Sequence, residues 1–65
     1  MLRFTLEKMR AMVAAGVALV APENRIPEEY FVVGFSYDAA GMMDGAICQA
    51  KKSGRWYAVS RYALS

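Results

Sequence analysis

The chain has 65 residues, of which 57% are hydrophobic and 22% charged, and it carries a formal charge of +2 with no histidine. This balance argues against intrinsic disorder, which requires few apolar residues. The length excludes a multidomain enzyme, and the lack of histidine removes the commonest general base and the commonest metal ligand. We expect residues 1–65 to form a single small domain.

A chain of this size buries only about 60% of the surface that its unfolded form exposes, so its own core stabilises it weakly. Disulfides, metals or partner chains often compensate in such domains. Cys48 is the sole cysteine, which excludes an internal disulfide and leaves a zinc site unsupported. We therefore expect a homo-oligomer, most simply a dimer, or docking on a larger protein. The unpaired thiol favours a reducing compartment, and hence the cytoplasm.

The N-terminal segment has the spacing of a helix over residues 5–21. Thr5 can cap its first turn, and Pro22 ends the pattern. Apolar residues recur at intervals of three and four, namely Leu6, Met9, Val13, Val17 and Val20. Gly16 weakens the interior of this helix. The alternative is a helix that ends at Gly16 and is followed by a strand over residues 17–21, but the spacing favours the longer helix.

The rest of the chain reads as a loop followed by strands. Two prolines place a loop at residues 22–29, and alternation predicts strands at about 30–37, 42–51 and 55–64. Two turn signals, Asp38–Gly41 and Asp44-Gly45, compete for the tip of the first hairpin. In the first strand one face carries Phe31, Val33, Phe35 and Tyr37, of which we expect the first three in the core.

These elements predict an α+β fold in which an N-terminal helix packs on one face of a three-stranded antiparallel meander. One helix covers only one face, so the other face must be polar, pair with another copy or bind a partner. We expect small Ala46, Cys48 and Ala50 beneath the helix, where they leave room for Trp56 and Tyr62. The partner-binding residues predicted for the open side are Tyr30, Val32, Gln49, Lys51, Arg55, Tyr57 and Arg61.

The C-terminal third is basic and aromatic, which suggests nucleic acid as an alternative partner. Its cations are Lys51, Lys52, Arg55 and Arg61, and Tyr57 lies among them. Such cations can neutralise phosphates and a tyrosine can stack on a base. Cations on an edge strand also prevent aggregation, which is the plainer interpretation. Five carboxylates in residues 23–44 suit either a solvated loop or a basic partner.

No catalytic set is recognisable. Cys48 is the one strong nucleophile, but no histidine can activate it, and its apolar neighbours indicate a small buried side chain. The carboxylates form no spaced acid–base pair, and no glycine loop suits a phosphate. We expect no catalytic residue, metal or cofactor. The uncharged stretch 11–22 is too short to cross a bilayer, so we expect no membrane contact.

Together these observations favour a small non-enzymatic protein–protein interaction module, a regulator or inhibitor that docks on a larger protein. Phage-encoded factors that inhibit host defences are often of this size and build, although no residue of this chain carries that comparison. The alternative is a nucleic-acid-binding module that uses the basic aromatic C-terminal strand.

Overall fold

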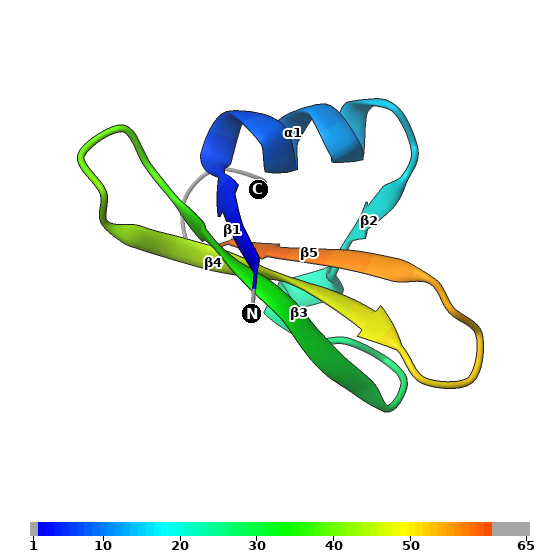
Figure 1. Cartoon of the computed structure of the whole chain (residues 1–65). Coiled ribbons are helices and arrows are strands. Elements are labelled where there is room, and N and C mark those ends of the chain that lie inside the picture. The colour runs from blue at the N-terminus through cyan, green and yellow to red at the C-terminus, as the bar shows by residue number, and fades with distance from the viewer. Residues whose placement is uncertain (1, 61–65) are drawn as a thin grey trace.

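The computed structural model describes residues 2–60 and shows an α+β domain with one short helix and a five-stranded mixed sheet (Figure 1). The predicted α+β class is confirmed, but the three-stranded sheet is wrong. Its elements are β1 (Leu2–Thr5), α1 (Leu6–Ala14), β2 (Ala18–Val20), the 3-10 turn η1 (Pro22–Asn24), β3 (Tyr30–Tyr37), β4 (Met43–Ala50) and β5 (Trp56–Ser60). The order across the sheet is β1-β3-β4-β5-β2.

The central strands β3, β4 and β5 pair antiparallel, whereas β1 and β2 add one parallel strand at each edge. The chain therefore passes along α1 from one edge of the sheet to the other, and it forms the three central strands afterwards. In Figure 1, α1 lies on one side of the sheet. The segment between β2 and β3, residues 21–29, lies on the other side and is called the connector below. No helix among residues 2–60 is long and apolar enough to cross a membrane.

Helix α1 ends at Ala14, so the prediction of a helix over 5–21 is wrong and the shorter alternative describes the chain. Thr5 is the N-cap, and its side chain accepts a hydrogen bond from the Lys8 amide at 2.9 Å. Gly16 adopts a φ of 75°, which glycine reaches without steric cost. Val17 N–H donates to the carbonyl oxygen of Met12 at 2.9 Å, which completes a Schellman motif and turns the chain into β2.

The hairpin tip between β3 and β4 is the first of the two turn signals. Gly41 N–H donates to the carbonyl oxygen of Asp38 at 3.0 Å. The Asp38 carboxylate accepts hydrogen bonds from the amides of Ala40 and Met42, each at 2.9 Å. This local bonding fixes the turn. Gly45 instead lies within β4, where it pairs with Ser36 on one side and Ser60 on the other.

A β-bulge at Val33 changes which side chains of β3 share a face. Val32 pairs with Cys48 and Gly34 pairs with Ile47, so Val33 is one extra residue in β3. The extra residue reverses the alternation, and Phe35 lies on the face opposite Val33. The prediction that Phe31, Val33, Phe35 and Tyr37 point the same way is therefore wrong.

The core beneath α1 is built on Met9, Ala18, Ile47 and Ala58, all of them buried. The side chains that pack around these four are Phe4, Leu6, Met12, Val13, Val33 and Trp56. Ile47 occupies the place beneath the helix that we predicted for Ala46, Cys48 and Ala50, which lie on the other face. Trp56 lies on the helix side as expected, Phe31 is 47% exposed rather than in the core, and Tyr62 lies outside the described residues.

A second cluster holds the connector against the sheet face opposite α1. Ala21, Ala50 and Tyr57 are buried there, and Ile26 and Val59 pack around them. Lys51 N–H donates to the carbonyl oxygen of Glu29 at 2.9 Å, which ties the end of the connector to the end of β4. The connector therefore covers the β5 side of this face.

Candidate functional site

The sheet face opposite α1, called the outer face below, carries a row of apolar side chains. Pairing places Val32 beside Cys48 and Phe35 beside Ala46 across β3 and β4. Directly paired residues project to the same face. No described helix or strand lies over this part of the face. We define the outer patch as Tyr30, Val32, Phe35, Tyr37 and Ala46; Tyr30 is exposed and the other four are half-buried.

A cation borders the outer patch at its β1 side. Arg3 pairs with Phe35 in the parallel ladder, and its guanidinium carbon lies 3.8 Å from the centre of the Tyr37 ring. This is a cation–π contact. It puts a positive charge beside an aromatic surface.

Glu28 anchors the connector to the outer face through Tyr57. The Tyr57 hydroxyl donates to Glu28 Oε2 at 2.6 Å, and Arg55 Nη1 lies 3.5 Å from the same oxygen. The Tyr57 hydrogen bond, supported by Arg55, lowers the pKa of Glu28. The same bond raises the pKa of Tyr57, because losing its proton would place a second anion beside the carboxylate.

The structure places the predicted partner-binding residues in three locations. Tyr30 and Val32 belong to the outer patch; Tyr57 shares its face but is only 4% exposed. Gln49 lies on the helix face beside Trp56, and its side-chain amide donates to the Gly54 carbonyl oxygen at 3.1 Å. The predicted cations Lys51, Lys52 and Arg55 are exposed around the β4–β5 turn, and Arg61 lies outside the described residues.

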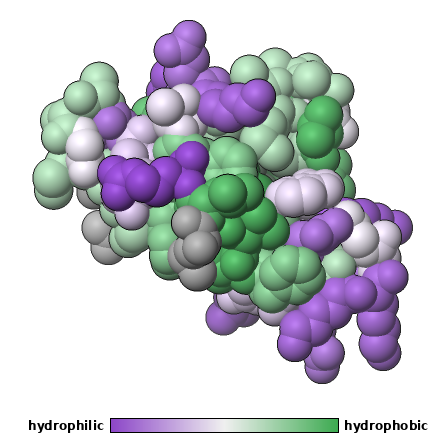
Figure 2. Space-filling model, in the orientation of Figure 1, coloured by the Kyte–Doolittle hydropathy of each residue, from purple (hydrophilic) through white to green (hydrophobic). Residues whose placement is uncertain are grey.

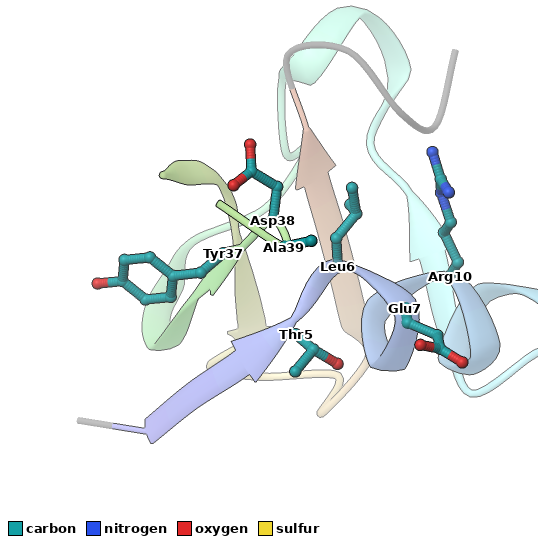
Figure 3. A pocket seen from close by; sticks show the side chains of 7 residues that line it. All are labelled: Thr5, Leu6, Glu7, Arg10, Tyr37, Asp38 and Ala39. Atoms are coloured by element: carbon teal, nitrogen blue, oxygen red, sulfur yellow. The ribbon is translucent and has the colours of Figure 1, made fainter. Parts of the chain in front are cut away.

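A pocket of about 300 Å³ lies between the start of α1 and the β3–β4 turn (Figure 3). The residues that line it are Thr5, Leu6, Glu7, Arg10, Tyr37, Asp38 and Ala39. In Figure 3 the polar ends of Tyr37 and Glu7 point to opposite sides, and the Asp38 carboxylate and the Arg10 guanidinium do not converge on one point. Catalysis requires convergent groups, so this pocket is not a candidate active site.

The buried polar and thiol groups add no reactive centre within residues 2–60. Burial raises the pKa of Cys48, which favours the unreactive protonated thiol. Ser60 Oγ donates to the buried Asp44 carboxylate, while Ser36 Oγ is buried without a hydrogen-bond partner. Across the described residues no group of three His, Cys, Asp or Glu side chains could hold a metal ion.

Sequence reasoning missed two sets of residues that bear on binding. It assigned Phe35 to the core and Tyr37 to the same face, because nothing in the alternation marks the bulge at Val33. It also placed Leu19 and Val20 in the helix, although both lie exposed in the edge strand β2. Gly16 was the available signal for that strand, since glycine commonly ends a helix.

Comparison of the chain with models of protein families, with curated proteins and with solved structures finds no match. The residues themselves therefore carry what can be argued about function. Two surfaces stand out among them: the outer patch and the exposed edge of β2.

Proposed function

We propose that the protein is a small non-enzymatic interaction module that docks on a larger protein through the outer patch and acts as a regulator or inhibitor. The observation that supports this is the apolar character of a sheet face that α1 leaves uncovered. A sheet face that meets water normally carries polar side chains at alternate positions. Here those positions of β3 hold valine, phenylalanine and tyrosine.

The composition of the patch suits a protein partner. Tyrosine and arginine are enriched among the interface residues that contribute most to protein–protein binding. A tyrosine ring in particular is buried at little cost in conformational entropy. Tyr30 is 46% exposed, and Tyr37 carries Arg3 on its ring. A partner that covered these rings would remove apolar surface from water while leaving the hydroxyls and the guanidinium at the rim.

Cytoplasmic action is part of the proposal. Cys48 is free and buried, and a reducing compartment keeps such a thiol unpaired.

Photo-crosslinking at single positions tests the docking surface. A benzophenone amino acid replaces Tyr30 in the outer patch, and a matched variant carries it at Ala14 on the exposed side of α1. After irradiation in the native cells, we expect one discrete protein adduct from position 30 and none from position 14. Adding Val32→Asp should abolish that adduct. The same adducts from both positions, or none from position 30, would rule out the outer patch as the docking surface.

Nucleic-acid binding remains a second candidate because three cations surround one turn. Lys51, Lys52 and Arg55 are exposed at the β4–β5 turn, near the exposed ring of Tyr30, which pairs with Ala50. Figure 2 shows hydrophilic side chains gathered at the lower right, where Figure 1 places this turn. Two observations weaken this candidate: Tyr57 is buried, and Arg55 is paired with Glu28.

A salt titration of binding to a short single-stranded oligonucleotide tests the second candidate. Phosphate contacts make affinity fall steeply as salt rises. We expect Lys51→Glu combined with Lys52→Glu to abolish binding if the turn is the contact. Binding that does not change with salt, or that survives the double substitution, would exclude this role for the turn.

A further inference from the structure

We propose that the outer edge of β2 pairs antiparallel with the same edge of a second copy of this chain. The resulting two-fold dimer would join two five-stranded sheets into one continuous sheet. This edge is separate from the outer patch, so the dimer leaves the proposed docking surface free.

The backbone of β2 has hydrogen-bonding groups available for another strand. Within residues 2–60, β2 pairs with β5 alone and stands at the end of the strand order. Ala21 N–H donates to the Ala58 carbonyl oxygen at 3.1 Å, so the backbone groups of Ala21 point toward β5. Alternate residues point the same way along a strand. The amides and carbonyls of Ala18 and Val20 therefore face outward, where they form a template for pairing.

The side chains around this edge are apolar and lack the charges that normally block edge pairing. Val17, Leu19 and Val20 are 55%, 49% and 42% exposed. No charged residue occurs from Ala11 to Pro22. Figure 2 shows hydrophobic colouring at the upper right, where Figure 1 places the α1–β2 loop. An exposed apolar edge without lysine, proline or an inward charge invites another strand.

The opposite edge of the sheet, formed by β1, is less suited to pairing with another strand. β1 contains the charged residue Arg3, whereas β2 contains no charged residue. Of the two edges, β2 is the one that fits a partner strand.

A second copy is the occupant that the register favours. With the two-fold axis at Leu19, Ala18 faces Val20 of the other copy, and each such pair can exchange two backbone hydrogen bonds, because both residues point outward. The strand that would pair, Ala18–Val20, carries no charge, so no like charges are opposed. Pro22 would end the pairing because it has no N–H. An uncharged strand thus matches itself without any electrostatic penalty.

The size of the core gives such a dimer a physical reason. The largest fully buried side chains among the described residues are Met9, Ile47 and Ser36, which is little apolar volume for a domain. Small domains without disulfides or metals often add stability through association. Extending the sheet would also cover apolar side chains that the single chain leaves in water.

Sedimentation equilibrium over a range of concentrations tests the dimer directly. We expect a mass that rises from the chain mass of 7.2 kDa to twice that value. Val20→Pro removes an outward N–H from each copy and should raise the dissociation constant about 10- to 100-fold. Val20→Ala is the matched control, because it shortens the same side chain but keeps the N–H, and its effect should be several-fold smaller.

A cysteine pair locates the interface. In a Cys48→Ala background, Leu19→Cys places two thiols across the two-fold axis, in a pair whose Cα atoms would lie about 4.5 Å apart. That separation suits a disulfide. Leu2→Cys is the control, because Leu2 is 60% exposed on the other edge. Mild oxidation should link the Leu19→Cys chains at least about tenfold faster, in line with the higher effective concentration of paired sites.

Three results would overturn the proposal. The first is a monomer at every concentration up to about 1 mM, a range in which even weak association is visible. The second is a dimer that Val20→Pro leaves intact while circular dichroism shows a folded chain. The third is equal oxidation rates for Leu19→Cys and Leu2→Cys. Each of these leaves the photo-crosslinking test of the outer patch unaffected, so the two ideas fail independently.

Discussion

Ile47 and Cys48 are neighbours in β4, yet they show how differently the two faces of the sheet are built. Both are buried, at 0% and 2% exposure. Ile47 lies beneath α1 and contacts a core that includes Met9. Cys48 points to the outer face, where its paired neighbours are Val32 and Tyr57. On one face a helix removes a large side chain from water, while on the other a small side chain is shielded by larger ones within the sheet.

This difference separates stability from recognition. Burial of large apolar groups beneath a helix provides most of the folding free energy. The outer face contributes less, because its larger side chains, such as Val32 and Phe35, stay half-exposed. We therefore expect substitutions on the helix face to unfold the protein and those on the outer patch to affect binding first.

The largest expected effect is on stability at Ile47. Ile47→Ala removes three carbons from a fully buried site and should lower the free energy of unfolding by about 3 kcal/mol. The adjacent Cys48→Ala removes one sulfur from the outer face and should cost about 1 kcal/mol, within the range of a small buried truncation. Urea unfolding followed by circular dichroism measures both. Equal losses at the two positions would contradict the contrast between the faces.

A smaller loss of stability is expected when an atom is added at Gly34 than when atoms are removed at Ile47. A Cβ at Gly34 would lie 2.3 Å from the Leu2 carbonyl oxygen, so Gly34→Ala must push β1 away from β3. We expect a loss of about 2 kcal/mol, typical of overpacking. Ala46→Val on the half-open outer face is the control and should change stability by less than about 0.5 kcal/mol. Faster amide exchange in β1 for Gly34→Ala would identify the displaced strand, and unchanged exchange would argue against it.

The comparison of faces also shows how far the sequence could predict the molecule. The Thr5 cap, the limits of β3 and the Asp38 turn depend on neighbouring residues, so local patterns reveal them. The Val33 bulge depends on β4, and the alternation from Phe31 to Phe35 reads equally well without it. That extra residue moved Phe35 from the predicted core to the outer patch.

The sequence did not predict strand β2 for a related reason. It has three residues, and its pairing with β5 joins segments almost forty positions apart in the chain. Its apolar residues also continue the spacing of α1, so periodicity alone cannot separate helix from strand. Tyr30 and Val32 could be placed on the open face because they precede the bulge. The burial of Tyr57 depends on the connector, whose path no local pattern specifies.

The smallest expected effect is the pH dependence of the contact that anchors the connector to the outer face. The Tyr57 hydrogen bond lowers the pKa of Glu28 below 4.5. The stability that the ionised Glu28 carboxylate contributes is therefore complete above about pH 4.5, and it is lost as the pH falls through the pKa of Glu28 in the folded protein. The same bond raises the pKa of Tyr57 above 10.0. The stability that the protonated Tyr57 hydroxyl contributes is therefore complete below about pH 10, and it is lost as the pH rises through the pKa of Tyr57 in the folded protein. Thermal unfolding of Tyr57→Phe should therefore show a weaker fall in melting temperature at both extremes than the parent shows. Tyr30→Phe removes an exposed phenol and serves as the control, so a Tyr57→Phe profile parallel to that of the parent would show that the Glu28–Tyr57 bond does not hold the connector in solution.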